Sequence, residues 1–126
     1  MSTLKADTIV AADGTSPVTL TKQSAAKAWV KFNGSTVTIV DDVNVASITD
    51  NGTGDFTINM SSSFATANYC VSSTNGKIAN NSGIWSVAEN SAASPTTSAY
   101  RLNVQSPSGT QNDNTSIKNT FHGDLA

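Results

Sequence analysis

The segment Asp50-Asn51-Gly52-Thr53-Gly54-Asp55 brings carboxylates, an amide and glycines together in a short stretch of chain. Oxygen ligands spaced by glycines are what a Ca²⁺-binding loop needs, but this segment lacks the distal glutamate and the full spacing of such a loop. The same residues tolerate the positive φ that tight β-hairpins require. The segment is therefore predicted to be a hairpin turn, and no metal ion is expected there.

Candidates for covalent or acid–base catalysis are few. A hydrolytic triad needs a nucleophile, a base and an orienting group, yet the only histidine is His122 and the only cysteine is Cys70. We expect His122 to be solvated and Cys70 to be a small, semi-buried strand residue. The adjacent acids Asp41 and Asp42 are interpreted as a turn. Zinc-ligand spacing and a phosphate-binding loop are both missing, so the sequence favours a protein that is not an enzyme and needs no cofactor.

Small polar residues dominate the 126-residue chain, with 18 serines, 17 threonines and 13 asparagines. Such residues suit turns and strand surfaces and weaken helix interiors. Hydrophobic residues (37%) and charged residues (13%) are both scarce, and the net charge is −2. We expect one domain with a thin core, without a basic surface for nucleic acid or anionic membrane. Residues 1–10 carry no signal-peptide pattern, and no apolar run is long enough to span a membrane.

Alternating apolar and polar residues indicate short strands. Phe56, Ile58 and Met60, separated by single polar residues, are typical of a half-buried strand. Turn signals spaced by roughly 8–12 residues predict an all-β fold, an antiparallel β-sandwich of jelly-roll type, with a small barrel as the alternative. The predicted strands are residues 28–32, 36–40, 43–48, 55–60, 68–72, 84–88, 99–104 and 116–121. The predicted core is Trp29 or Val30, Phe32, Val37, Ile39, Val45, Ile48, Phe56, Ile58, Met60, Tyr69, Val71, Trp85 or Ile84, Tyr100, Leu102 and Val104.

The chain divides into an arm, residues 1–23, and a β-sandwich body, residues 24–126, whose last residues, 122–126, form a tail without a pattern. The arm is too short to hold a core of its own, so we expect it to pack on a neighbouring molecule. The residues expected to dock are Leu4, Ile9, Val10, Val18 and Leu20.

Two polar stretches, residues 88–98 and 105–115, read as long exposed loops, where β proteins commonly carry recognition surfaces. The candidate recognition residues are Glu89, Asn90, Thr96, Ser106, Thr110 and Asn112.

Residues 3–10 and 16–24, followed by residues 25–34, 47–56 and 68–69, resemble small modules of tailed-bacteriophage structural proteins. The likeness is greatest to tail-fibre-like proteins of marine and cyanobacterial phages, and it covers about the first 70 residues. It implies a β-rich unit that trimerises, is made in the host cytoplasm and is displayed on the virion, with the arm attached to other virion proteins. Because the chain carries a single β unit, a compact spike is favoured over a long fibre.

A homotrimer also agrees with the thin core, because a closed ring shares apolar area and removes free sheet edges. The expected function is a surface attachment component of the particle, with no nucleic acid or membrane as partner. The alternatives are a capsid decoration (cement) protein that stabilises the head, and a carbohydrate-binding module that presents aromatic residues near Trp85 or Tyr100 to a host-surface glycan.

Overall fold

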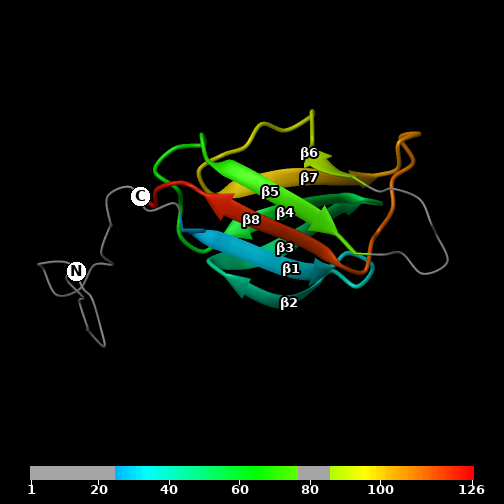
Figure 1. Cartoon of the computed structure of the whole chain (residues 1–126), viewed down its shortest axis with the longest axis horizontal. Helices are drawn as coiled ribbons and strands as arrows, with labels where there is room; N and C mark the ends of the chain where they lie inside the picture. Colours follow the sequence, from blue (N-terminus) through cyan, green and yellow to red (C-terminus); the bar gives the residue numbers. More distant parts are fainter. Residues whose placement is uncertain (1–24, 77–85) are drawn as a thin grey trace, which may run out of the picture.

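The computed structural model describes residues 25–76 and 86–126, in which eight strands form two antiparallel four-stranded sheets (Figure 1). The first sheet has the order β2-β1-β8-β5 and consists of β1 (Ala28–Asn33), β2 (Thr38–Val43), β5 (Cys70–Asn75) and β8 (Ile117–His122). The second has the order β3-β4-β7-β6 and consists of β3 (Val45–Gly52), β4 (Asp55–Met60), β6 (Ser86–Glu89) and β7 (Ala99–Gln105). The predicted all-β sandwich is confirmed.

The chain changes sheet after β2, β4, β5 and β7, so half of the neighbouring strand pairs are distant in sequence. In the first sheet β8 lies between β1 and β5, and in the second β7 lies between β4 and β6. The two sheets form separate layers, as Figure 1 shows with β1, β5 and β8 in front of β3, β4 and β7. This arrangement corresponds to the sandwich and not to the barrel. None of the described segments forms a helix that could cross a membrane.

The core lies between the sheets, where alternate residues of the central strands point inward. Phe56 and Ile58 of β4, Leu102 of β7 and Ile117 and Phe121 of β8 are completely buried. The other buried hydrophobic residues are Ala28, Val30, Phe32, Val45, Met60, Phe64, Tyr100 and Val104. Removing these apolar surfaces from water is the main favourable term for folding. Because successive side chains of a strand point to opposite faces, the apolar residues gather on one face of each sheet.

An aromatic cluster closes one part of this core. The ring of Phe121 lies 5.5 Å from that of Tyr100, 5.9 Å from that of Tyr69 and 6.4 Å from that of Phe64, measured between ring centroids. Edge-to-face arrangements at these separations add to the energy of burial. The rings of Phe64 and Tyr69 come from the connection between β4 and β5, so the cluster ties that connection to both sheets.

The first two strand boundaries differ from the prediction because two residues adopt a left-handed backbone. Val37 has φ of 52° and Asn44 has φ of 58°, which interrupts the strands at positions that carry no glycine. As a result β2 begins later than expected and contains Asp41 and Asp42, which were expected to form a turn. The corner lies at Asn44, where the Asp42 carboxylate accepts the backbone N–H of Val45 at 3.1 Å.

The predicted core needs several corrections. Val30 points inward and Trp29 outward, and Val37 lies in the turn before β2 and not in the core. Ile39, Ile48, Tyr69 and Val71 are only partly buried against the core, whereas the prediction omitted Ala28, Phe64, Ile117 and Phe121. Ile84 and Trp85 lie outside the described residues.

The C-terminal residues are ordered by backbone pairing and do not form a tail without structure. Phe64 and Leu125 form an isolated antiparallel bridge. On either side of it, the Ala65 N–H donates to the Asp124 carbonyl at 2.8 Å and the Ala126 N–H donates to the Ser63 carbonyl at 2.9 Å. The end of the chain is therefore fixed to the connection that supplies Phe64 to the core.

Candidate interaction surfaces

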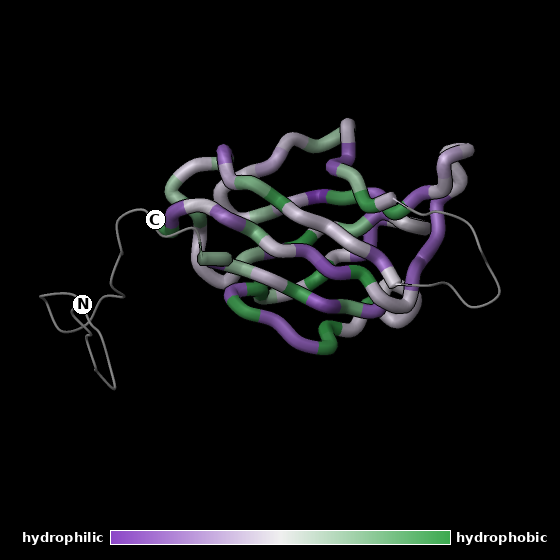
Figure 2. The backbone as a smooth tube through the Cα atoms, viewed as in Figure 1, coloured by the Kyte–Doolittle hydropathy of each residue, from purple (hydrophilic) through white to green (hydrophobic). Residues whose placement is uncertain are grey.

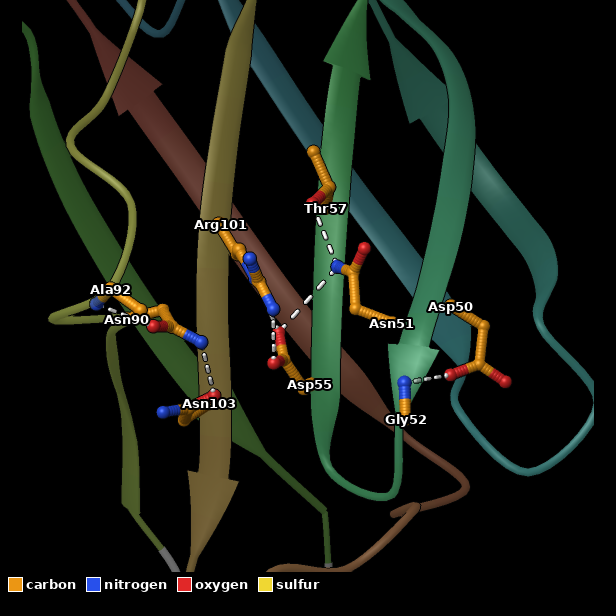
Figure 3. A network of polar contacts seen from close by, with 9 residues as sticks. All are labelled: Asp50, Asn51, Gly52, Asp55, Thr57, Asn90, Ala92, Arg101 and Asn103. Atoms are coloured by element: carbon orange, nitrogen blue, oxygen red, sulfur yellow. Dashed lines mark hydrogen bonds and ion pairs between the residues drawn. The ribbon is translucent and has the colours of Figure 1, made fainter.

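The outer face of the β3-β4-β7-β6 sheet carries a connected set of polar side chains (Figure 3). Successive strand residues point to opposite faces, so Asp55 and Thr57 of β4 point outward while Phe56 points into the core. On β7 the outward residues include Arg101 and Asn103. The register pairs Asp55 with Asn103 and Thr57 with Arg101, which sets Arg101 diagonally across from Asp55.

Asp55 and Arg101 form a two-pronged ion pair. Arg101 Nε–H donates to Asp55 Oδ1 at 2.8 Å, and Arg101 Nη2–H donates to Asp55 Oδ2 at 2.7 Å. This hydrogen bonding is the main reason that the pKa of Asp55 is lowered, against the opposing effect of burial. The same pairing raises the pKa of Arg101. Asp55 is therefore an ionised carboxylate whose two oxygens are both occupied.

Amide side chains extend the network along the sheet. Asn51 Nδ2–H donates to Thr57 Oγ1 at 2.8 Å and lies 3.5 Å from Asp55 Oδ1. Asn59 Nδ2–H donates across the strands to Ser47 Oγ at 3.1 Å and to Thr49 Oγ1 at 3.0 Å. These bonds fix long polar side chains against the sheet, so this face presents a pre-ordered hydrophilic surface without large apolar groups.

The segment of residues 50–55, considered above as a calcium-binding loop, is a hairpin turn. Its two carboxylates bind different groups and do not point to a common site. β3 continues to Gly52, and Asp50 Oδ1 accepts the Gly52 backbone N–H at 2.9 Å (Figure 3). Asp55 is held by Arg101 on the other side of the turn. Among residues 25–76 and 86–126, no three His, Cys, Asp or Glu side chains gather in a way that could hold a metal ion.

The candidate recognition residues lie in different surroundings. Glu89 ends β6 and is exposed, as are Thr96 and Thr110. Asn90 is only 5% exposed; its amide donates to Asn103 Oδ1 at 2.8 Å and its carbonyl oxygen accepts the Ala92 N–H at 2.8 Å. Ser106 Oγ accepts the Thr110 N–H at 3.1 Å.

Polar side chains within residues 88–98 and 105–115 thus hold these two loops in place through hydrogen bonds. Asn112 is half-buried, and its backbone N–H donates to the Val104 carbonyl at 3.2 Å. Asn90 in particular serves to hold its loop against β7. The arm residues Leu4, Ile9, Val10, Val18 and Leu20 lie outside the described residues.

The outer face of the β2-β1-β8-β5 sheet has a different character. The register aligns Val43, Trp29, Thr120 and Ser72 in one row across the four strands. Val43 is 46% exposed and Val40, on the same edge strand, is 57% exposed. In Figure 2, β2 forms the lower rim of the molecule and alternates hydrophobic and hydrophilic segments. This face therefore exposes apolar side chains that the other face does not.

The next row of the same face is charged. Lys31 pairs in register with Lys118 on one side and with Asp41 on the other. The Arg101–Asp55 ion pair lies on the other sheet and involves neither lysine. Like charges directly opposite each other on neighbouring strands repel and destabilise the pair. The row beside the apolar one thus carries two positive groups and one negative group, in the order Asp41, Lys31 and Lys118.

Three residues considered for chemistry or for stacking are now located. Cys70 is an exposed free thiol on the outer face and not a semi-buried residue, and it pairs in register with His122 of β8. Tyr100, considered as part of an aromatic platform, is 5% exposed, and burial raises its pKa. Burial also raises the pKa of Tyr69 to about 12, and its hydroxyl donates to the Thr96 and Ala99 carbonyls. Trp85 lies outside the described residues.

Sequence reasoning missed Arg101 and the lysine pair, and it left open whether Trp29 or Val30 points to the core. The alternation within the predicted strand 99–104 already placed Arg101 on the face opposite Tyr100 and Leu102, and an arginine is noteworthy in so weakly charged a chain. The meeting of Lys31 with Lys118 depends on the pairing of β1 with β8, for which the sequence holds no local signal.

Comparisons with protein-family models, with curated proteins and with solved structures found no match for this chain.

The Asp55–Arg101 pair should make stability depend on acid pH. Because the folded pKa of Asp55 lies below its unfolded value, the stabilisation is present above the unfolded pKa and is lost as pH falls through the folded pKa. An Asp55→Asn variant should therefore be less stable than the parent at pH 7 and show a flatter decline below about pH 4. Urea unfolding between pH 2 and 7 measures this, with Asp50→Asn as the control that leaves Arg101 paired. Parallel pH curves for Asp55→Asn and the parent would show that the pair does not carry the dependence.

Proposed function

We propose that this chain is a structural module of a tailed-bacteriophage particle, a non-enzymatic homotrimer displayed on the virion surface and held there by residues 1–23. The observation that supports this is the difference between the two outer faces of the sandwich. One face is a closed polar network around Asp55 and Arg101, suited to water. The other exposes Val43 beside Trp29, with Val40 also exposed on its edge strand, and is suited to contact with protein.

The thin core supports the same proposal. Among the described residues, three buried positions, Asn90, Asn114 and Asn119, are polar and add no apolar surface to the core. A small domain gains stability when association removes further apolar surface from water. The likeness of residues 3–10 and 16–34 to phage tail-fibre-like modules gives the partner class: copies of the same chain and other virion proteins.

Mass and location test the proposal together. Light scattering of the purified chain at micromolar concentration should give three times the 13.0-kDa chain mass. Electron microscopy of particles that carry a tagged copy should place the tag on the virion surface, with a tail position supporting an attachment component and a head position supporting the decoration role. A stable monomer that is missing from purified particles would overturn the proposal.

Deletion of residues 1–23 should leave the sandwich folded and remove the protein from particles, because residues 25–76 and 86–126 supply the eight strands of both described sheets. Circular dichroism and thermal melting report the fold, and immunoblots of purified particles report incorporation. A full-length control separates the effect of the apolar side chains from the effect of removing the segment. In this control five residues are changed to Ser: Leu4, Ile9, Val10, Val18 and Leu20. Full incorporation of both variants would show that the arm is not the anchor.

A further inference from the structure

We infer that the peptide link between Asn51 and Gly52 is a self-modification site, at which the folded chain loses the side-chain amide as ammonia and gains aspartate or isoaspartate. The sequence contains three asparagines that precede a glycine, at positions 33, 51 and 75. Asparagine is one of the thermolabile residues of proteins, and a following glycine leaves the backbone nitrogen without a side chain to shield it. The fold protects two of these links and leaves the third open to reaction. The inference concerns the chain itself and does not rest on its proposed place in a virion.

The reaction needs only the chain and water. The Gly52 backbone nitrogen attacks Asn51 Cγ, the bond from Cγ to Nδ2 breaks, and Nδ2 leaves as ammonia while the Gly52 nitrogen gives up its proton. The product is a succinimide ring. Water then opens the ring: cleavage between the nitrogen and Cγ gives aspartate, and cleavage between the nitrogen and the main-chain carbonyl carbon gives isoaspartate. The glycine nitrogen must therefore be able to turn toward Cγ and to lose its proton.

Two of the three links are held by the sandwich. The Gly34 N–H donates to the Asn114 carbonyl at 2.8 Å, and the Gly76 N–H donates to the Ser116 carbonyl at 2.6 Å. A Cβ atom added at Gly34 would lie 2.9 Å from the Asn114 carbonyl oxygen, and one added at Gly76 would lie 2.7 Å from Ser116 Cβ. Neither backbone has room to turn, and a main-chain carbonyl is a poor acceptor for a proton. Both links therefore react only after a local opening of the fold.

The third link lies in an irregular part of the β3–β4 hairpin (Figure 3). The register shifts between Asp50 and Gly52, so Asn51 is the extra residue of a bulge and has no cross-strand position opposite it. Asn51 and Gly52 are exposed, and a Cβ atom added at Gly52 would meet nothing within 4 Å. The backbone can therefore turn at this link without moving the core.

The group that accepts the Gly52 N–H also differs from the other two. It is the carboxylate of Asp50, whose Oδ1 lies 2.9 Å from the Gly52 nitrogen (Figure 3). A carboxylate can take a proton, and one within hydrogen-bond reach of the proton to be removed has the position of a general base. The leaving amide of Asn51 is held by exposed contacts, to Thr57 Oγ1 at 2.8 Å and to Asp55 Oδ1 at 3.5 Å, which water can replace.

The reaction changes the polar network on this face. Position 51 loses the N–H groups that face Thr57 and Asp55, and a carboxylate appears beside the carboxylate of Asp55. Neighbouring like charges repel, and the chain, whose net charge is −2, gains one more negative charge. In the isoaspartate product the main chain is also one carbon longer within the hairpin. The modified chain should therefore bind more strongly to an anion-exchange column and melt at a lower temperature than the fresh chain.

Incubation of the purified, folded chain in mildly alkaline buffer, followed by peptide mapping with mass spectrometry, tests the inference. Conversion at position 51 should be at least about tenfold faster than at positions 33 and 75, because reaction there needs a local opening that costs at least about 1.4 kcal/mol. In urea, where the bonds of the sandwich are lost, the three positions should convert at similar rates. The product at position 51 should include isoaspartate, which forms through the ring and not by direct hydrolysis of the amide.

Two glutamine variants are the matched controls. Asn51→Gln keeps an amide but needs a larger ring, so its acidic form should not accumulate on the anion-exchange column. Asn59→Gln changes another amide of the same face, one that precedes methionine, and should leave conversion at position 51 unchanged. Circular dichroism shows that both variants are folded. Equal conversion at positions 33, 51 and 75 in the folded chain, no conversion at position 51, or aspartate there without isoaspartate would each overturn the inference.

Discussion

A Gly54→Ala variant is expected to lose about 2–4 kcal/mol of folding free energy, from a strained backbone and a steric clash acting together. Gly54 has φ of 66°, in the left-handed region that side chains disfavour. A Cβ atom added there would lie 2.6 Å from the Val104 carbonyl oxygen and 2.7 Å from the Asn112 backbone nitrogen, so the backbone itself would have to move.

The position matters because three segments meet at it. The Gly54 N–H donates to Asp113 Oδ1 at 2.6 Å, and the Gly54 carbonyl accepts the Val104 N–H at 2.7 Å. The β3–β4 turn is thereby joined to β7 and to the loop that follows it. Displacing Gly54 would break these bonds and loosen residues 105–115, one of the two candidate recognition loops.

Gly109→Ala is the matched control. Gly109 has φ of 82°, but a Cβ atom there would meet nothing within 4 Å. This variant should lose only the backbone strain, about 1 kcal/mol. Urea unfolding at fixed protein concentration measures both changes, and equal losses for the two variants would show that close approach at Gly54 is not the cause.

The strand pattern of this chain could be predicted wherever local signals were complete. β4 begins and ends at the predicted residues because apolar side chains alternate through it and glycine-rich turn residues precede it. The predicted turn was real but shorter than expected, since β3 continues to Gly52. The prediction missed the β2–β3 corner because Asn44 adopts positive φ where the chain changes sheet, and it missed the start of β2 because Val37 adopts positive φ in the β1–β2 turn. Nothing local in the sequence requires either conformation.

Two questions limited what the sequence could predict about the two outer faces: which of two neighbouring residues points to the core, and which strands pair with each other. Trp29 and Val30 are neighbours, and periodicity alone could not decide which one points to the core; the packing of β1 against the other sheet, where Phe32 meets Phe56, decides it. Asp55 and Arg101 are 46 residues apart, and only the pairing of β4 with β7 brings them together. The outward direction of Arg101 could therefore be read from sequence, but its partner could not.

Phe121→Ala is expected to have the largest effect on the fold, about 3–5 kcal/mol, from the lost burial of the ring and the cavity left behind. Phe121 is completely buried on the central strand β8, and its ring contacts those of Phe64, Tyr69 and Tyr100. A domain of this size is stable by only about 5–15 kcal/mol, so the variant should be close to unfolding at 37 °C. Its melting temperature and urea midpoint give the measurement.

The control for this variant is the preceding residue. Thr120→Ala changes the same strand on the opposite face, where the side chain is half-buried and outside the core, and should cost no more than about 1 kcal/mol in folding. Neighbouring residues of one strand thus have different weight: Phe121 holds the two sheets together, and Thr120 contributes little to folding. Equal urea midpoints for the two variants at a concentration where the protein is monomeric would contradict that division, because the core contacts of Phe121 would then carry no more energy than an outward threonine.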